Sequence, residues 1–346
     1  METLNEIVLK VQHYLSDYIL IVALVVAGLW FTARTGFIQV RGFKRGMKQV
    51  FGGLFGKKGE AGNDGMSSFQ ALATAIAAQV GTGNIAGAAT AIAIGGPGAI
   101  FWMWAAAFLG MATIYAEALM AQKYKQVGAD GIVTGGPVYY IRAAFNNVFG
   151  KVLAGIFAVL LIFALGFMGN AVQSNSIASS FNTAFGIPQW IMGLIVAVLA
   201  LFIFSGGMKR IAKVTETMVP LMAALYIIGS LIVIIYNWRN IPLAFYEIFV
   251  GAFAPSSIAG GAVGATIKLA LTKGVARGLF SNEAGMGSTP HAHAVAKVDH
   301  PVEQGHAAMI GVFIDTFVVL TMTALVIVTT RALPESYKVV DGGYTA

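Results

Sequence analysis

Residues 79–87 read Gln-Val-Gly-Thr-Gly-Asn-Ile-Ala-Gly, and they lie inside an apolar stretch, 67–94, that contains no charged residue. Each glycine costs roughly 1 kcal/mol relative to alanine in a helix interior, so this segment is prone to unwind. Backbone groups that are released inside a membrane are tolerated only where protein buries them or where they line a wet cavity. The stretch therefore predicts a broken membrane helix with a binding site at its break. The alternative is that the glycines only let helices pack closely.

A second run of the chain matches the first. Residues 283–288 read Glu-Ala-Gly-Met-Gly-Ser, and they align with Gln-Val-Gly-Thr-Gly-Asn of residues 79–84, with both glycines in register. Glycine-interrupted spans at corresponding positions of two halves indicate the central site of a transporter. Five helices, counted from the first broken helix up to the second, separate the two runs, so the halves have opposite topology. The pattern predicts an inverted repeat.

Composition gives the class of protein. Hydrophobic residues make up 57% of the chain and charged residues 11%, which is far outside the soluble range. We assign eight apolar stretches as spans and name the first the pre-helix and the others helices 1 to 7: 18–32, 67–94, 99–122, 152–180, 189–205, 214–236, 262–296 with an interruption, and 305–330. They predict a single all-α transmembrane domain over 1–346. Its parts are the pre-helix at 18–32, a first five-helix repeat at 67–236 and the start of a second, inverted repeat at 262–330.

The charges indicate a bilayer rather than nucleic acid as the surroundings of the chain. The net charge of +7 comes from short basic clusters between the apolar stretches. An N-terminus outside the cell puts 15 of the 22 basic residues inside, where Lys and Arg are retained: Arg34, Arg41, Lys44, Arg45, Lys48, Lys57, Lys58, Lys123, Lys125, Arg142, Lys151, Lys209, Arg210, Lys213 and Lys297. We expect a multi-pass protein of the plasma membrane in that orientation, with no binding to nucleic acid.

Four stretches carry a resemblance to a known family. They are Ser-Phe-Gln-Ala-Leu at 68–72 with Gly-Thr-Gly-Asn-Ile-Ala-Gly at 81–87, Gly-Gly-Pro-Gly-Ala-Ile-Phe-Trp-Met-Trp at 95–104, Gly-Asn-Ala-Val-Gln-Ser-Asn-Ser at 169–176, and Gly-Val-Ala-Arg-Gly-Leu-Phe-Ser-Asn-Glu-Ala-Gly at 274–285. On these residues the chain resembles the alanine or glycine:cation symporter family, which has the leucine-transporter-type fold. Ala105 departs mildly from the family pattern. The resemblance implies sodium-coupled symport of small neutral amino acids into the cell by alternating access.

The resemblance also implies a substrate site near the bilayer midplane, between helices 1, 3 and 6. Amides freed around Thr82 suit the carboxylate of an amino acid, and carbonyls freed near Phe280 and Ser281 suit its ammonium group. The candidate substrate-binding residues are Gln79, Gly81, Thr82, Gly83, Phe167, Asn170, Gln173, Phe280, Ser281, Glu283, Gly285 and Met286, and the candidate cation-binding residues are Val80, Gly83 and Asn84. Alanine or glycine, sodium as the coupling ion and the lipid bilayer are the expected partners.

Two of these assignments have structural alternatives. Asn170 and Gln173 recur at helical spacing on helix 3, and Gln173 is the first choice there for substrate contact. Both amides instead suit hydrogen bonds between helices, worth about 0.6 kcal/mol each. Phe167 and Phe280 are placed to close the pocket, although a Phe in a membrane helix more often faces lipid or the core.

The ionisable residues within spans are functional candidates, because a charge there is costly. Glu283 lies in the second break, Asp315 is a weaker candidate in helix 7, and Glu117 is expected at the interface. The alternative for Glu283 and Asp315 is a buried ion pair with Lys273 or Arg277. Three basic residues in the first half of helix 6 must face protein, water or the interface rather than lipid: Lys268, Lys273 and Arg277.

Two other functions stay open at this point. His291, His293, Asp299, His300 and His306 have the composition of a metal site in a membrane-embedded hydrolase, but they lack the spacing of a zinc motif. A transporter of the same fold with another substrate, or one coupled to protons through Glu283 or Asp315, is the nearer alternative. Sodium-independent uptake that depends on pH would favour it.

The second repeat is incomplete in these residues. The first repeat supplies five helices, whereas the second supplies two before the polar run 331–346. In the resembling fold, a sodium ion lies between the break in helix 1 and hydroxyl groups on an eighth helix. We therefore expect the natural product to extend by roughly 100 residues that carry three or more further spans.

Overall fold

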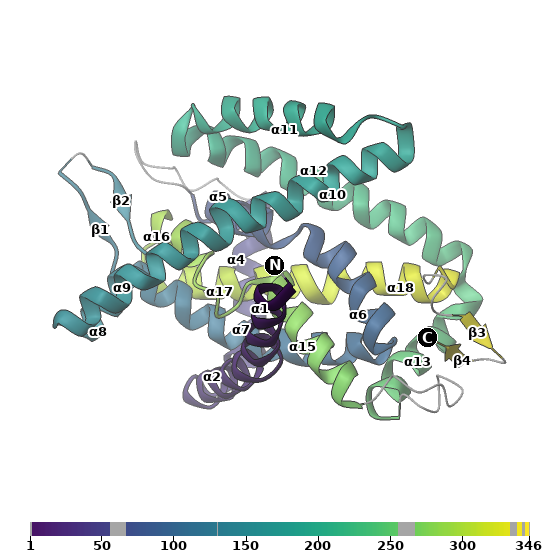
Figure 1. Cartoon of the computed structure of the whole chain (residues 1–346). Coiled ribbons are helices and arrows are strands. Elements are labelled where there is room, and N and C mark those ends of the chain that lie inside the picture. The colour runs from purple at the N-terminus through teal and green to yellow at the C-terminus, as the bar shows by residue number, and fades with distance from the viewer. Residues whose placement is uncertain are drawn as a thin grey trace.

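The computed structural model describes residues 2–55, 67–129, 131–254, 267–332, 338–340 and 343–345. The described chain is mostly helical, and its strands form two short antiparallel hairpins (Figure 1). β1 (Gln126–Val127) pairs with β2 (Val133–Thr134), and β3 (Lys338–Val340) pairs with β4 (Gly343–Thr345). The expected helical architecture with several apolar helices is confirmed.

A long N-terminal rod contains the predicted pre-helix. It consists of α1 (Glu2–Tyr14), the π-helical turn η1 (Leu15–Ile19) and α2 (Leu20–Arg34), which follow one another without interruption. Figure 1 shows the rod leaning out from the other helices. Gly28 lets α2 approach a neighbouring helix closely, because a Cβ at this position would lie 2.7 Å from Cβ of Leu109.

Both predicted broken helices are interrupted. Helix 1 is divided into α5 (Ser68–Gln79), the π-helical segment η2 (Gly83–Gly87) and α6 (Ala88–Gly95). Ser67 begins it with a capping box, in which the side chains of Ser67 and Gln70 accept hydrogen bonds from each other's backbone N–H. Helix 6 is divided into α15 (Ile267–Asn282) and α16 (Pro290–Val295). The predicted start of helix 6, 262–266, lies outside the described residues.

Five helices of the described chain are long and apolar enough to cross a membrane: Glu6–Arg34, Gly98–Lys123, Val148–Phe185, Gly207–Tyr236 and Pro301–Thr330. Eight spans are predicted from the sequence. The numbers differ because each part of a broken helix is short by itself, and because helix 4, now α11 (Gln189–Phe204), has 16 residues. The five long helices correspond to the predicted pre-helix and to helices 2, 3, 5 and 7.

Helix 2, now α7 (Gly98–Lys123), lies at the centre of the fold and packs against α15 and α17 (Pro301–Val312). Small residues allow this close packing: a Cβ at Gly274 would lie 2.4 Å from the carbonyl oxygen of Ala99, and one at Gly278 would lie 3.1 Å from Cα of Met103. Glycine packing of this kind therefore occurs in helix 6, beside the interruption that the glycines near residue 285 produce. In helix 6, glycines thus permit close packing at Gly274 and Gly278, while those near residue 285 lie in the interruption.

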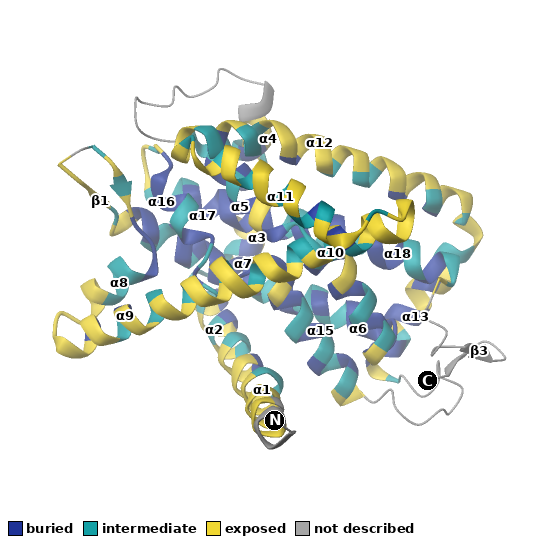
Figure 2. Ribbon diagram, turned by 45° about the horizontal axis from the view of Figure 1, so that its top comes forward, coloured by how far each residue is buried: buried dark blue, intermediate teal, exposed yellow. Residues whose placement is uncertain are grey.

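Helices 3 to 5 cover one side of the molecule. Helix 3 consists of α9 (Val148–Leu161), the π-helical segment η3 (Ile162–Gly169) and α10 (Asn170–Phe185), and α11 and α12 (Gly207–Tyr236) follow. Figure 2 shows that α9, α11 and α12 expose much of their surface, whereas α7, α15 and α17 are largely buried. Many of these exposed side chains are large and apolar, as expected of helices that face lipid.

Helix 7 runs as α17, the π-helical segment η5 (Phe313–Leu320) and α18 (Thr321–Thr330). Its first half packs with α5 and α7 in one apolar cluster that includes Leu72, Met111 and Ile310. Its second half packs with α6 in another that includes Ile92 and Leu320. Helix 7 therefore lies against both parts of the broken helix 1.

Four helices do not correspond to any predicted element. They are α3 (Ile38–Arg41), α4 (Phe43–Phe55), α8 (Pro137–Ala144) and α13 (Ile241–Phe253). α4 packs on α17, where a Cβ at Gly46 would lie 2.7 Å from Cγ1 of Ile310. Each is too short to be recognised as a span, and the basic residues of α4 resemble those of a cytoplasmic loop. The 3₁₀ turn η4 (Trp238–Asn240) joins α12 to α13.

Candidate functional site

The break in helix 1 releases two backbone amides next to helix 3. It begins directly after α5, where Val80 has an extended backbone with φ −78° and ψ 99°. The Gly81 amide donates to Oδ1 of Asn84 at 3.0 Å, and the Thr82 amide donates to Oε1 of Gln173 at 3.3 Å. Both freed amides therefore take side-chain carbonyl oxygens as their acceptors.

The same break holds buried polar atoms without hydrogen-bond partners among the described residues. They are Oγ1 of Thr82 and Oε1 of Gln79. The other end of the Gln79 amide is used, because Nε2 donates to the carbonyl of Asn282 at 2.9 Å. Buried polar groups are nearly always hydrogen-bonded, so an unpaired one in a native structure calls for an explanation such as a bound ion, ligand or water.

The break in helix 6 is held by carboxylates. Its backbone turns through positive φ values at Glu283 (+56°), Gly285 (+87°) and Gly287 (+78°), of which only the glutamate is unusual for its residue type. The Gly285 amide donates to Oε2 of Glu117 in α7 at 3.0 Å, and the Ser288 hydroxyl donates to the carboxylate of Glu283. This break is therefore fixed by its own side chains and by helix 2.

The two breaks touch each other. A Cβ at Gly83 would lie 2.9 Å from Cα of Ser281, so this position accepts only a glycine without local movement. The hydrogen bond from Gln79 to the Asn282 carbonyl joins the end of α5 to the end of α15. The interrupted parts of helices 1 and 6 therefore form one polar centre, although 203 positions separate these two residues.

A buried carboxylate lies directly behind this contact. Asp315 of η5 is 0% exposed, and its carboxylate accepts hydrogen bonds from Nδ2 of Asn84 at 2.7 Å, from the Ser281 hydroxyl at 3.1 Å and from the Thr316 hydroxyl at 2.8 Å. We call these four residues the Asp315 cluster. It joins helices 1, 6 and 7 through oxygen-rich side chains.

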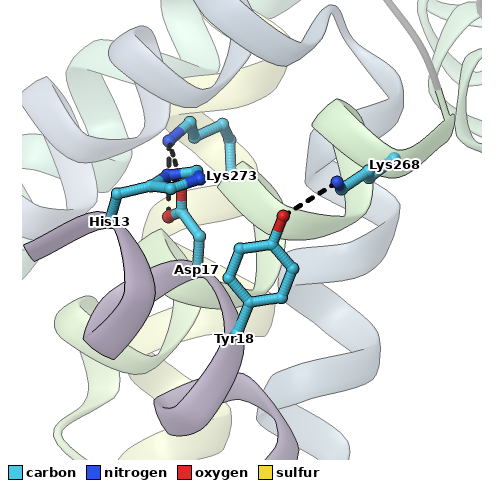
Figure 3. Close-up of polar contacts among 5 residues, drawn as sticks. All are labelled: His13, Asp17, Tyr18, Lys268 and Lys273. Atoms are coloured by element: carbon cyan, nitrogen blue, oxygen red, sulfur yellow. Dashed lines mark hydrogen bonds and ion pairs between the residues drawn. The ribbon is translucent and has the colours of Figure 1, made fainter. Parts of the chain in front are cut away.

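The structure differs from one alternative and one expectation about the ionisable residues. Lys273 pairs with Asp17 of the rod at 3.3 Å (Figure 3), and no ion pair within the described ranges joins Lys273 or Arg277 to Asp315 or Glu283. The buried ion pair, which was the alternative for Glu283 and Asp315, is thus absent from that part of the chain. Glu117 was expected at the interface, but it is buried and accepts the Gly285 amide.

A cavity of about 590 Å³ opens beside the helix 1 break. Helix 3 forms its opposite wall, and the end of α15 and the helix 6 break form a third side. Nine of the predicted substrate-binding residues line it: Gln79, Gly81, Thr82, Gly83, Asn170, Gln173, Phe280, Glu283 and Met286. We call it the central cavity.

The other predicted residues lie elsewhere. Ser281 is buried in the Asp315 cluster, Gly285 lines a neighbouring cavity, and Phe167 is 59% exposed and does not line the central cavity. Of the predicted cation-binding residues, Val80 and Gly83 line the central cavity, whereas Asn84 is fully buried against Asp315. Asn84 therefore connects the cavity wall with the Asp315 cluster.

Some residues of the polar centre are missing from the predicted site. Asn282 holds Gln79 through its carbonyl, and its side chain accepts a hydrogen bond from the Ala284 amide at 3.1 Å. Glu117 had a usable signal, since a carboxylate within a long apolar helix is a functional candidate by default. Asn282 had none, because a single amide at a helix end has no distinctive spacing.

The histidines do not gather into one group. His293 is buried and its Nδ1 lies 2.7 Å from Oε1 of Gln304, and His291 Nδ1 lies 3.0 Å from the carbonyl of Ser288. Among the residues that the structure describes, no three His, Asp or Glu side chains are placed to share a metal ion. Nothing in this geometry supports hydrolytic chemistry.

Apolar helices of membrane-spanning length and two interrupted helices around a polar cavity define a membrane transporter. The chain belongs to the sodium:alanine symporter family, whose model matches residues 1–344. It is therefore a transporter and not an enzyme, and the hydrolase alternative is wrong. The description of the family indicates sodium and alanine as the solutes that its members transport.

The names of three relatives agree with this assignment. The chain is 44% identical to the sodium/alanine symporter AgcS of Methanococcus maripaludis, over 89% of this chain and 67% of the relative. It is 46% identical to the putative sodium/proton-dependent alanine carrier protein YrbD of Bacillus subtilis, over 88% and 60%. It is 43% identical to the probable sodium/glutamine symporter GlnT of the same organism, over 94% and 66%. The chain spans about two thirds of the length of these relatives.

Proposed function

We propose that this chain carries the substrate site of a sodium-coupled symporter that moves small neutral amino acids, alanine and glycine, into the cell by alternating access. We further propose a leucine-transporter-type inverted repeat in the plasma membrane, with the N-terminus outside. The observation that carries the proposal is the helix 1 break, where the residues with freed amides line a cavity shared with helices 3 and 6. Two unpaired buried oxygens lie in the same break.

The substrate carboxylate binds at the Gly81 and Thr82 amides. Oε1 of Gln173 now accepts the Thr82 amide at 3.3 Å, a long hydrogen bond that a carboxylate oxygen can replace with a stronger, charge-assisted one. The half-helix η2–α6 begins just beyond these amides, and its dipole favours an anion at its N-terminus. Gln173 is then released to contact the substrate.

The ammonium group binds opposite, at the end of α15. No described residue donates a hydrogen bond to the carbonyl of Phe280 or Ser281. Glu283 adds a carboxylate to the same side of the central cavity. An ammonium group offers three N–H donors, which suits this set of acceptors.

Sodium is held by the helix 1 break and the Asp315 cluster. Carboxylate, hydroxyl and carboxamide oxygens are ligands that a hard cation prefers, and Asp315, Ser281, Thr316 and Asn84 supply all three types. No Lys or Arg of the described chain contacts Asp315, so a cation is needed to balance its charge when it is ionised. Asn84 also binds the Gly81 amide, which couples the cation to the carboxylate wall.

The size of the substrate follows from the walls of the cavity. Gly81 and Gly83 on one side and Phe280 and Met286 on the other leave room near the amides for a small side chain. We expect alanine, glycine and serine to bind and leucine to be rejected by steric clash. Leucine that competes with labelled alanine as strongly as glycine does would contradict this.

The experiment is uptake of labelled alanine by the full gene product in proteoliposomes, with and without an inward sodium gradient. Accumulation that requires the gradient supports the proposal. The alternative, favoured by the two buried carboxylates Glu283 and Asp315 and by the name of YrbD, is coupling to protons. Uptake that ignores sodium and follows an imposed pH gradient would establish that alternative instead.

Asp315→Asn tests the cation assignment separately. The exchange keeps the volume and removes the charge, so the sodium concentration that gives half-maximal alanine binding should rise at least tenfold. Thr316→Val is the milder companion, because it removes one oxygen ligand only. An unchanged sodium requirement in Asp315→Asn would place the ion elsewhere.

A further inference from the structure

A second cavity lies between the N-terminal rod and helix 6. It has a volume of about 360 Å³ and is separate from the central cavity, but both are lined by Phe280 and Met286. The rod contributes Gln12, Ser16 and Asp17 to its wall, and α15 contributes Lys273 and Arg277. We call it the outer cavity, because the N-terminal rod, whose N-terminus we propose to lie outside the cell, forms one of its walls. Phe280 and Met286 therefore lie at the boundary of the two cavities.

Two of its charges neutralise each other. The Lys273 ammonium lies 3.3 Å from the Asp17 carboxylate, which also lies 2.9 Å from Nδ1 of His13 (Figure 3). Lys268, one turn nearer the start of α15, donates to the Tyr18 hydroxyl at 3.0 Å and does not line the cavity. Figure 3 shows both lysines reaching from α15 to the rod. Both lysines contact the rod, and Lys268 does so as an exposed side chain.

Arg277 has no such partner. It is half-buried, it lines the outer cavity, and no described residue accepts a hydrogen bond or forms an ion pair with it. A guanidinium has five N–H donors in a planar fork and stays charged at any physiological pH. A fixed positive charge inside an apolar wall that includes Leu20, Leu279 and Phe280 is costly unless an anion joins it.

We propose that the outer cavity is a second amino-acid site, at which Arg277 binds the substrate carboxylate before the substrate passes Phe280 and Met286 into the central cavity. A carboxylate matches the guanidinium fork with two parallel hydrogen bonds. Gln12 and Ser16 of the rod supply polar oxygens on the opposite wall for the ammonium group. The inference rests on the proposed transport function and adds the path by which the substrate reaches the central cavity.

A lipid phosphate offers Arg277 the same acceptor chemistry. The shared boundary with the central cavity favours the amino acid, because Phe280 and Met286 line the outer cavity together with Arg277 and also line the central cavity together with Gly81 and Thr82. If the ligand is instead a lipid phosphate, a substitution at Arg277 should not change the concentration dependence of alanine transport in vesicles that lack anionic lipid. The composition of the vesicles therefore distinguishes the two ligands.

The test compares three variants of the full gene product in proteoliposomes of neutral phosphatidylcholine. Arg277→Gln should raise the alanine concentration for half-maximal uptake about tenfold, the loss expected for one charge-assisted bidentate contact, with the maximal rate unchanged. Arg277→Lys keeps the positive charge but loses the planar guanidinium. Its half-maximal alanine concentration should lie between those of Arg277→Gln and the unaltered protein. Lys268→Gln, on the same helix but outside the outer cavity, should match the unaltered protein.

A half-maximal concentration for Arg277→Gln within twofold of the unaltered protein would overturn the inference. A shift that appears only in vesicles with anionic phosphatidylglycerol would overturn it as well and assign the site to lipid. If Arg277→Gln lowers only the maximal rate, the residue serves folding or conformational change, and the inference also fails. Failure of the unaltered protein to transport alanine at all would contradict the proposed function, which is a distinguishable result.

Discussion

The two broken helices differ in what satisfies their backbone. In helix 1, the freed amides bind the side chains of Gln173 and Asn84, and two buried oxygens stay unpaired within the described chain. In helix 6, the Gly285 amide binds the buried Glu117 carboxylate, and the Glu283 carboxylate binds a hydroxyl within the same turn. The helix 1 break therefore has backbone amides available to a ligand, whereas the turn of helix 6 beyond Ser281 is largely satisfied by protein.

This difference indicates that the two interrupted helices have different roles, although their glycine patterns are alike. The glycine pattern is the same in both runs, but Glu117 reaches only the second one, from α7. A carboxylate that accepts a backbone amide contributes roughly 1.5–3 kcal/mol and fixes the geometry of the turn. We therefore expect helix 6 to be the rigid side of the proposed site and helix 1 to be the side that responds to substrate and sodium.

The largest expected effect is at Gly83, where helix 1 touches helix 6. Gly83→Leu should abolish alanine binding, since even a Cβ here would lie 2.9 Å from Cα of Ser281. Gly87→Ala is the matched control on the same helix, because its Cβ would meet nothing closer than 3.9 Å. Equilibrium binding of labelled alanine in detergent, on samples with unchanged size-exclusion profiles, makes the comparison. Normal binding by Gly83→Leu would place the site elsewhere.

A smaller effect is expected at Glu117, and it should appear in stability. Glu117→Ala removes the buried carboxylate that accepts the Gly285 amide, and the loss of this hydrogen bond to a carboxylate should cost about 2 kcal/mol of unfolding free energy. Glu117→Gln keeps an acceptor oxygen and should lose about half as much. Thermal unfolding in detergent measures both variants. Equal stability of Glu117→Ala and the unaltered protein would show that helix 2 does not fix the helix 6 break.

The smallest effect is expected at Ser288, which donates to Glu283 inside the break. Ser288→Ala removes one hydrogen bond and should cost about 1 kcal/mol of stability, with little change in alanine affinity. Ser281→Ala is the informative partner, since Ser281 donates to Asp315 instead. We expect Ser281→Ala to weaken sodium activation. Loss of sodium activation in Ser288→Ala rather than Ser281→Ala would reverse the roles of the two hydroxyls.

The local sequence was enough to predict the features of this site that depend on the backbone. Glycine spacing located both interruptions, and helical spacing located Gln173, because these features follow from residues close together in the chain. The contact of Glu117 with Gly285 joins residues 168 positions apart, so only the packing of α7 against helix 6 reveals it. Similarly, Phe167 has the right spacing, but the rotation of helix 3 leaves it exposed. Helical periodicity shows which residues share a face of a helix, but it does not show which neighbouring helix or solvent covers that face.

The account is tested most directly by comparing thiol reactivity at the two breaks. The 346 residues contain no cysteine, so Thr82→Cys in helix 1 and Ser288→Cys in helix 6 each introduce one thiol into this part of the protein. The measurement is the rate of modification by a small methanethiosulfonate reagent, with and without alanine and sodium together. We predict that alanine and sodium slow modification at Thr82→Cys at least tenfold and leave Ser288→Cys within twofold. Protection at Ser288→Cys alone, or at neither position, would contradict the assignment of the helix 1 break as the substrate site.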